Sequence, residues 1–190
     1  MVTPPDLVNA ISVLGRQRPV IVVGISGFGG SGKSTLARQL VDSIEGSARI
    51  RGDDFLDPAR SHQRSADWDG VDRVRLRAEV LDPFRAGQQG FFRRFDWSAR
   101  QLGKSEPIPD ARILVVDAIG LLHPELDGAL DLTIWIDVDL DLATKRGKAR
   151  DKKLGRSHEG LWDEVWVPNE RDFVARFDPR ARADYLFESA

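Results

Sequence analysis

A glycine-rich stretch limits the folds open to this chain more than any other part of its sequence. It reads Gly27-Phe28-Gly29-Gly30-Ser31-Gly32-Lys33-Ser34 and matches G-x-x-x-x-G-K-[ST], the pattern of a phosphate-binding P-loop. The β-branched run 20–25 before it is typical of a parallel strand buried on both faces, and the helical pattern 33–44 follows it. Strand, loop and helix in this order predict a phosphate site at a strand end.

The residue types of this stretch suit a nucleotide and a magnesium ion. Glycines let successive backbone N–H groups turn inward around phosphate oxygens, and the following helix directs its positive dipole end to the same place. Lys33 supplies a positive charge for the β- and γ-phosphates, and Ser34 offers a hydroxyl to Mg²⁺. We therefore expect ATP and Mg²⁺ as cofactors. The expected nucleotide-binding residues of the loop are Gly27, Gly29, Gly30, Ser31, Gly32, Lys33, Ser34 and Thr35.

Further strand and helix patterns alternate along the chain. Strands are expected at 48–50, 112–116, 132–138 and 185–187, and helices at 7–14, 71–84, 139–150 and 161–177. Gly15 offers a stop for the first helix, and the stretch 90–97 indicates an exposed strand or hairpin. Alternation of this kind predicts an α/β fold of three layers, with a mainly parallel five-stranded sheet, helices on both faces and a small lid.

The overall composition narrows the partners and the compartment. With 28 basic and 30 acidic residues among 190, the chain has no large positive field for nucleic acid or an anionic membrane. It contains no cysteine, so disulfides, thiolate zinc sites and cysteine nucleophiles are excluded. Neither a signal-peptide pattern at the N-terminus nor an apolar run long enough for a bilayer is present. We expect a cytoplasmic protein with a small-molecule partner, and leave a homo-oligomer open.

Acidic residues follow two of the predicted strands. The apolar run 113–116 ends in Asp117, which we expect to contact Mg²⁺ together with Ser34, usually through water, although it could also cap a turn. Asp53 and Asp54 follow the strand at 48–50, where strand ends open toward the nucleotide. A carboxylate there can accept the proton of an attacking hydroxyl. The pair also fits an Asx turn, and the sequence leaves open which of the two would be the base.

The sequence separates several classes of P-loop protein. The string 117–120, Asp-Ala-Ile-Gly, fits the D-x-x-G of GTPases, but Asn-Lys-x-Asp, which reads the guanine base, occurs nowhere in the chain. The chain also lacks a Leu-Ser-Gly-Gly-Gln-like signature of transport ATPases. A kinase is therefore favoured over these two classes.

Five motifs occur in order along the chain. They are Gly-Gly-Ser-Gly-Lys-Ser-Thr at 29–35, Asp-Asp-Phe at 53–55, Asp-Trp-Asp at 67–69 followed by Asp72, Phe-Asp-Trp at 95–97, and the basic stretch 146–151 with Gly155-Arg156. In this set the chain resembles the uridine kinase and phosphoribulokinase family, to which pantothenate kinases and several sugar kinases also belong. The similarity covers nearly the whole chain.

The resemblance implies a strand order of 2-3-1-4-5 and specific roles for single residues. Asp53 would be the general base, Asp69 would bind hydroxyls of the acceptor, and Arg150 and Arg156 would contact the ATP phosphates from the lid. The dense basic run at 145–156 agrees with a lid, because positive groups on a mobile segment neutralise the charge of the migrating phosphoryl group. Asp53, Lys33 and Arg150 are thus the expected catalytic residues.

The sequence says less about the acceptor than about the nucleotide. Phe95 and Trp97 would wall an acceptor pocket beside Asp53 and Asp69, since ligand sites are lined by apolar and aromatic side chains. Uridine-cytidine kinases carry a Tyr and a nearby His that hold the pyrimidine, whereas this chain has Phe95 and then Ser-Ala-Arg at 98–100. Many family members also have a strand-end Glu where this chain has Asp117. Arg93 and Arg94 could guard an edge strand or contact an anionic acceptor.

Together these features predict one kinase domain over residues 1–190. The P-loop and base segment would span 17–55, an acceptor-binding insertion 56–110 and the lid 145–157. The expected reaction moves the γ-phosphoryl group of ATP to a hydroxyl of a nucleoside, a sugar or a pantothenate-like acceptor. One alternative is a regulatory P-loop NTPase without a small acceptor, and another is phosphorylation of nucleic-acid ends.

Overall fold

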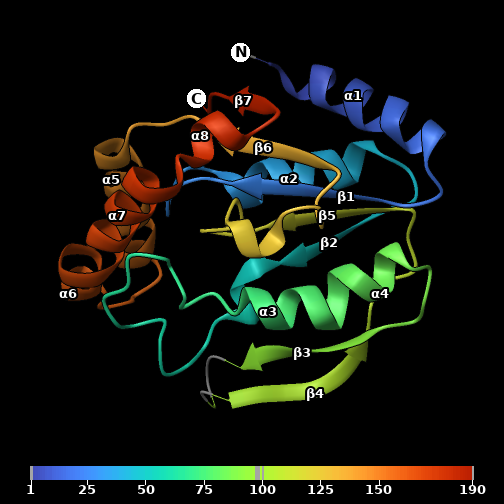
Figure 1. Ribbon diagram of the computed structural model, residues 1–190. Helices are drawn as coiled ribbons and strands as arrows, with labels where there is room; N and C mark the ends of the chain where they lie inside the picture. Colours follow the sequence, from blue (N-terminus) through green and yellow to red (C-terminus); the bar gives the residue numbers. More distant parts are fainter. Residues whose placement is uncertain (1, 97–98, 100, 190) are drawn as a thin grey trace.

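Residues 2–96, 99 and 101–189 are described by a computed structural model, and within them five strands form a fully parallel central sheet (Figure 1). The strands are β1 (Ile21–Ser26), β2 (Ser47–Arg51), β5 (Ile113–Asp117), β6 (Leu132–Ile136) and β7 (Tyr185–Phe187). Their order is β2-β5-β1-β6-β7, and every pairing in this sheet is parallel. The five-stranded sheet and its expected order are both confirmed.

Helices cover both faces of the sheet, as the α/β prediction requires. One face carries α1 (Pro4–Gln17) and α2 (Lys33–Ser43), and the other carries α3 (Arg73–Leu76), a π-helical turn (η2, Arg77–Leu81) and α4 (Asp82–Arg85) (Figure 1). Strand β1 contributes side chains to both helical layers, because successive side chains along a strand point to opposite faces of the sheet. Ile21, Val23 and Ile25 pack with α1 and α2, whereas Val22 packs with the opposite layer. All of these β1 side chains are fully buried.

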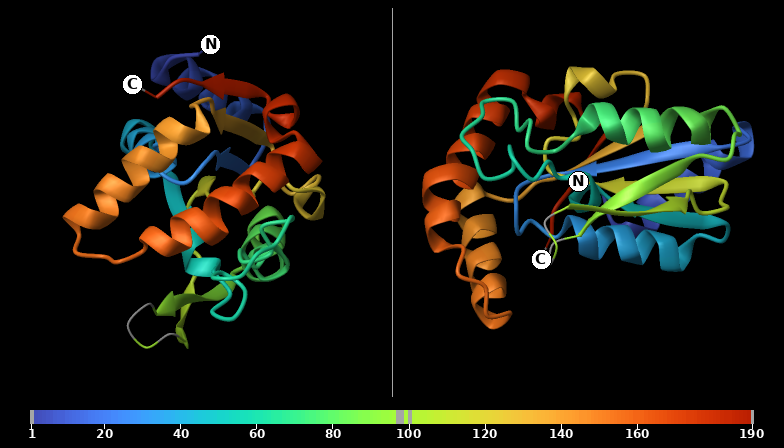
Figure 2. Two further views of the ribbon diagram at one scale, coloured as in Figure 1. Left: turned by 90° about the vertical axis from the view of Figure 1, so that its left-hand side faces the viewer. Right: turned by 90° about the horizontal axis from the view of Figure 1, so that it is seen from below.

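The C-terminal helices stand at the carboxyl ends of the strands, the edge where the P-loop lies (Figures 1 and 2). They are α5 (Leu140–Lys153), α6 (Glu159–Leu161), a π-helical turn (η4, Trp162–Trp166), α7 (Val167–Phe177) and α8 (Pro179–Arg182). Helix α5 begins after Asp139, whose side chain accepts hydrogen bonds from the N–H groups of Asp141 and Leu142. Loops and helices at this edge therefore enclose the phosphate site.

A two-stranded antiparallel hairpin projects from the layer of α3 and α4. Its strands are β3 (Phe91–Asp96) and β4 (Gln101–Pro107), with a register irregularity between Arg93 and Phe95. Phe92 attaches the hairpin by stacking on Phe55 of the 3₁₀ turn η1 (Gly52–Phe55), with ring centroids 5.7 Å apart. The hairpin expected at 90–97 is confirmed, and it does not join the central sheet.

Several expected helices differ from the structure in their ends or in their hydrogen-bonding pattern. Helix α1 continues through Gly15 to Gln17, so the predicted stop is wrong; Gly15 packs close to Ile113 and Ile21 instead. The helices expected at 71–84 and 161–177 are each interrupted by a π-helical turn. Another short 3₁₀ turn, η3, spans Pro124–Leu126. No helix in the described part of the chain has both the length and the apolar character needed to cross a membrane.

Candidate active site

The P-loop runs from the end of β1 to the start of α2 and packs closely against α5. Gly30 has a φ of +83°, and a Cβ atom there would lie 2.2 Å from the carbonyl oxygen of Ala143. Both the backbone angle and the close approach therefore require glycine at this position. Ser189 braces the same loop, because its hydroxyl donates to the carbonyl oxygen of Ser31 and accepts from Arg146. Arg146, part of the basic run, thus supports the loop from the side.

Lys33 is buried at the base of the P-loop. Its ammonium group donates to the carbonyl oxygens of Gly27 and Phe28 at 2.9 and 2.8 Å. Burial lowers the pKa of Lys33, and the negative charges of Glu170, Asp53 and Asp117 oppose that effect. The three carboxylates therefore lie near enough to Lys33 to act on its charge, which brings two of the predicted site residues, Asp53 and Asp117, to the P-loop lysine.

Ser34 and Asp117 meet beside Lys33, as the sequence predicted. The Ser34 hydroxyl donates to Asp117 Oδ2 at 2.8 Å. A hydroxyl and a carboxylate are oxygen ligands of the kind Mg²⁺ prefers, so the two side chains fit that ion. Both Asp117 oxygens also accept hydrogen bonds from Arg49, a contact that the sequence did not reveal. A contact between Asp117 and Mg²⁺ would therefore run through water.

The two neighbouring aspartates of η1 have different surroundings. The Asp53 side chain is 56% exposed and lies 3.7 Å from Arg51, whereas that of Asp54 is 6% exposed and lies 3.5 Å from Arg94. Burial raises the pKa of Asp54, and its Oδ2 atom has no hydrogen-bond partner. Asp53 is therefore the accessible carboxylate of the pair, and Asp54 is the buried one.

The other acceptor-side residues that the structure describes lie between η1 and the end of β3. Asp69 is partly buried and follows Trp68, which has a φ of +51° and is itself buried. Asp72 caps α3 by accepting the N–H of Arg75 at 3.0 Å. Phe95 is buried on β3, and Trp97 lies outside the described residues.

The arginines of the predicted lid are organised by a carboxylate that the sequence analysis did not single out. Asp151 is buried near the end of α5, and it accepts hydrogen bonds from Arg150 (2.9 and 3.1 Å) and from the Trp162 indole (3.0 Å). Its carboxylate also lies 3.9 Å from Arg156 and 3.3 Å from the ring of His158. Burial alone would raise the pKa of Asp151, but the hydrogen bonds from Trp162 and Arg150 outweigh it and lower the pKa.

These contacts connect the basic segment to the P-loop. The Trp162 ring packs so closely on Gly29 and Gly147 that a Cβ atom at either glycine would lie within 3 Å of it. The charge of Arg150 is near enough to Lys33 to lower the pKa of that lysine. The charge of Arg150 therefore acts on the P-loop lysine, and the Asp151 carboxylate lies beside both Arg150 and Arg156.

Glu170 of α7 is a further site residue that the sequence did not reveal. It is 2% exposed, and its Oε1 atom accepts the N–H of Gly29 at 2.6 Å. Burial raises the pKa of Glu170 to about 7, against the opposing effects of the Gly29 N–H and the Lys33 charge. Its Oε2 atom is buried without a hydrogen-bond partner. A carboxyl group that changes charge near neutral pH thus touches the P-loop.

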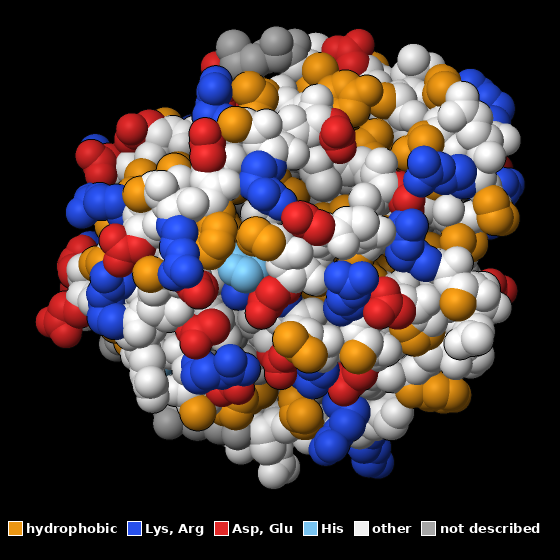
Figure 3. Space-filling view, viewed as in Figure 1, with side chains coloured by type: hydrophobic (Ala, Val, Ile, Leu, Met, Phe, Trp, Pro, Cys, Tyr) orange, Lys and Arg blue, Asp and Glu red, His pale blue; other side chains and the backbone are white. Residues whose placement is uncertain are grey.

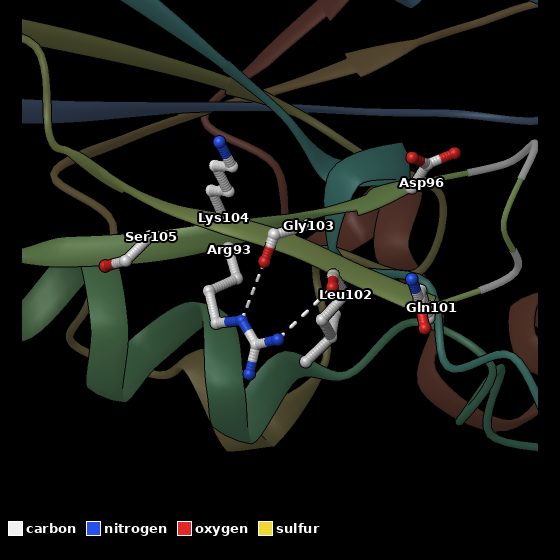
Figure 4. Close-up of a pocket in the computed structure, with 7 residues that line it drawn as sticks. All are labelled: Arg93, Asp96, Gln101, Leu102, Gly103, Lys104 and Ser105. Carbon is white, nitrogen blue, oxygen red and sulfur yellow. Dashed lines mark hydrogen bonds between the residues drawn. The ribbon is translucent and has the colours of Figure 1, made fainter.

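An open hollow on the hairpin lies apart from these residues. It is lined by Arg93, Asp96, Gln101, Leu102, Gly103, Lys104 and Ser105 (Figure 4). Arg93 donates to the carbonyl oxygens of Gly103 and Leu102 at 2.9 and 3.2 Å, so it ties β3 to β4. Arg94 instead pairs with Asp54 and Glu106. The hollow contains none of the P-loop residues.

Charges of both signs are mixed on one face of the molecule. On the face shown in Figure 3, Lys and Arg side chains are interspersed with Asp and Glu. That face offers no continuous positive surface of the kind that binds nucleic acid without sequence preference.

Known proteins resemble this chain in sequence. Residues 22–190 match the family model described as "Phosphoribulokinase / Uridine kinase family". The chain is 29% identical over 150 residues to uridine-cytidine kinase C of Dictyostelium discoideum, covering 76% of this chain and 33% of that protein. It is 27% identical over 157 residues to the uridine kinase of Halobacterium salinarum, covering 77% of this chain and 69% of that protein. The chain spans about a third of the length of the Dictyostelium and Saccharomyces cerevisiae relatives.

Solved structures show the same fold. A candidate fructose transport system kinase from Silicibacter sp. TM1040 matches with a TM-score of 0.77 at 20% identity, over 98% of this chain and all of that one. A candidate uridine kinase from Bacillus stearothermophilus matches with a TM-score of 0.69 at 18% identity, over 96% of this chain and 99% of that one. Identities of 18% and 20% support a shared fold and do not assign roles to the residues of the site.

Proposed function

The chain belongs to the phosphoribulokinase / uridine kinase family, and from that premise we propose that it is a kinase that transfers the γ-phosphoryl group of ATP to a hydroxyl group of a small metabolite. The observation that supports this most directly is the grouping of Lys33, Ser34, Asp117 and the accessible Asp53 at one strand edge. It combines a phosphate cradle, ligands for Mg²⁺ and a carboxylate that a substrate can reach.

In the proposed reaction, Asp53 accepts the proton of the acceptor hydroxyl as its oxygen attacks the γ-phosphorus. The bond from that phosphorus to the β,γ-bridging oxygen breaks, and ADP leaves with the electron pair. The P-loop N–H groups and Lys33 hold the β- and γ-phosphates in line with the attacking oxygen. Mg²⁺, when bound near Ser34 and Asp117, neutralises phosphate charge.

Arg150 and Arg156 act in this proposal as lid residues within the segment 145–157. Each side chain is about half exposed (54%), and both guanidinium groups lie against the Asp151 carboxylate, so contact with phosphates would replace part of that pairing. Closing the segment over ATP would exclude water and place positive charge against the transferring group. The insertion 56–110, which contains Asp69 and Phe95, would then position the acceptor next to Asp53.

The acceptor belongs to the nucleosides, sugars or pantothenate-like acids. The named relatives are uridine kinases, and one structural neighbour is a candidate fructose transport system kinase. Within the proposal, Asp69 would bind acceptor hydroxyls. A screen of ADP release across nucleosides, pentoses, hexoses and pantothenate would identify the acceptor class, and a chain that releases no more ADP with any of them than without would contradict kinase function.

Asp53→Asn tests the mechanism. The amide is nearly isosteric but cannot take the proton, so acceptor-dependent ADP release should fall by ~10²–10⁴-fold while ATP affinity stays within a few-fold. The matched control is Asp54→Asn, which changes the neighbouring carboxylate that faces the interior and should slow turnover far less. Near-normal turnover of the Asp53 variant, or a larger loss in the Asp54 variant, would refute the assignment of Asp53 as base.

A further inference from the structure

Arg49 lies on β2 and forms a two-pronged ion pair with the carboxylate expected next to Mg²⁺. Its Nε atom donates to Asp117 Oδ1 at 2.6 Å, and a terminal nitrogen donates to Oδ2 at 2.8 Å. The two side chains are 17% and 4% exposed. The hydroxyl of Ser34 donates to the same Oδ2 atom. A paired geometry of this kind fixes both the position and the orientation of a carboxylate.

The Arg49–Asp117 ion pair changes the net charge that a free divalent cation would encounter at this edge of the sheet. Without Arg49, the buried Asp117 would present a full negative charge next to the Ser34 hydroxyl. With Arg49 in place, the pair carries no net charge, and both carboxylate oxygens already accept hydrogen bonds. Buried Lys33 adds a further positive charge nearby, and the negative charge of Asp53 acts on both Lys33 and Arg49. The positive and negative charges at this edge nearly cancel, so the attraction for a lone cation is weak. The cancellation matters because Coulomb interactions in a partly buried site are several times stronger than in water.

Phosphates of a nucleotide would alter that balance. They bring several negative charges to the P-loop, and a cation could then bind between the phosphate oxygens and the Ser34 hydroxyl, with Asp117 contributing through water. We propose that Arg49 is a positioning residue that holds Asp117 as a neutral pair, so that a divalent cation binds to this protein only together with a nucleotide. This inference rests on the proposed use of Mg²⁺ and ATP.

Mn²⁺ binding provides a direct test, since free Mn²⁺ is counted by electron paramagnetic resonance without any turnover. The unsubstituted protein should bind Mn²⁺ at the P-loop only when ADP is present. Arg49→Gln leaves Asp117 uncompensated and should create Mn²⁺ binding without nucleotide, at least about tenfold tighter than in the unsubstituted protein. Adding Asp117→Asn to that variant should abolish the new binding.

Two further variants separate charge from general disturbance of the strand. Arg51→Gln removes the same charge two residues along β2, from an arginine that is next to Asp117 in the strand pairing but whose side chain contacts Asp53, and should leave Mn²⁺ binding without nucleotide unchanged within about threefold. Arg49→Lys keeps a positive charge, now on a compact ammonium group, and should again suppress Mn²⁺ binding in the absence of nucleotide. Circular dichroism would report whether each variant is folded.

The inference fails if the unsubstituted protein binds Mn²⁺ without nucleotide as tightly as Arg49→Gln does, or if nucleotide-free binding by the unsubstituted protein disappears in Asp117→Asn. The unsubstituted protein supplies that second result even if Arg49→Gln does not fold. Because neither titration involves an acceptor or phosphoryl transfer, failure of the ADP-release screen would overturn the proposed function and leave the role of Arg49 standing. Conversely, failure of the Mn²⁺ experiment would overturn the role of Arg49 and leave the proposed function standing.

Discussion

Replacing Glu170 by glutamine removes a titratable group from the wall of the P-loop while almost preserving the size of the side chain. In the folded protein, burial raises the pKa of Glu170 from 4.5 to about 7. A raised carboxyl pKa means that the stabilisation from the neutral form is complete below pH 4.5 and is lost as the pH rises through 7. At about 1.4 kcal/mol per pKa unit, ionisation of Glu170 costs the folded state about 3 kcal/mol by pH 8.

Glutamine resembles the neutral acid, so it avoids this cost. Its carbonyl oxygen can still accept the Gly29 N–H, but its NH₂ group would lie where Oε2 now has no partner, which costs about 1–3 kcal/mol at every pH. The informative quantity is therefore the pH dependence of the stability difference. Relative to the unsubstituted protein, Glu170→Gln should gain about 2 kcal/mol between pH 5.5 and pH 8.

Thermal unfolding across this pH range measures the gain. For a chain of this length, about 2 kcal/mol corresponds to a relative rise in Tm of roughly 4–8 °C. Glu164→Gln is the matched control, because it removes an exposed carboxylate from the neighbouring helical turn η4. After that control is subtracted, a Tm difference that stays constant from pH 5.5 to pH 8 would show that Glu170 does not change charge in this range, and the account of its burial would be wrong.

Three other substitutions test separate contacts. Lys33→Ala should remove most ATP affinity and nearly all ADP release, because the lysine meets the phosphates before and during transfer; normal ADP release would refute the P-loop assignment. Arg150→Ala should lower kcat more than ATP affinity if its charge acts on the closed complex, and a collapse of affinity alone in equilibrium nucleotide binding would make it a simple docking group. Gly147→Ala should destabilise the fold by about 1–3 kcal/mol in chemical denaturation, since the new Cβ would lie 2.4 Å from the Trp162 ring; unchanged stability would mean that this contact relaxes freely.

The inner strands β1, β5 and β6 of the central sheet were predictable because each has a largely apolar run, whereas the edge strands β2 and β7 have weaker patterns. The β-branched run that became β1 is buried on both faces, and its position before the P-loop indicates a parallel arrangement. The order of the strands came from the family resemblance, since periodicity alone does not say which strands are neighbours. The two π-helical turns were missed because they keep the apolar spacing of a helix closely enough to read as one.

The candidate site was predictable only where its residues form a short motif. Lys33 and Ser34 belong to one pattern, and Asp117 follows a recognisable strand. Glu170 is 141 residues from its partner Gly29, and Arg49 is 68 residues from Asp117. Neither residue stands in a local pattern that distinguishes it from a surface charge. Their contacts arise from the packing of α7 and the pairing of β2 with β5, which a single sequence does not display.

The segment between β2 and β5 leaves the sheet after Arg51 and returns to it at Ile113 on the neighbouring strand. Because the two strands are parallel, everything from η1 through the hairpin forms one excursion that starts at the carboxyl edge of the sheet and ends at its amino edge. The entropic cost of closing such a loop rises only slowly with its length. The hairpin part of this excursion, which does not join the central sheet, could therefore be lengthened, shortened or exchanged without altering the phosphate cradle, whereas α3, η2 and α4 form part of the core. For an engineer, the hairpin is the natural unit to graft when a different acceptor is wanted on the same nucleotide-binding frame.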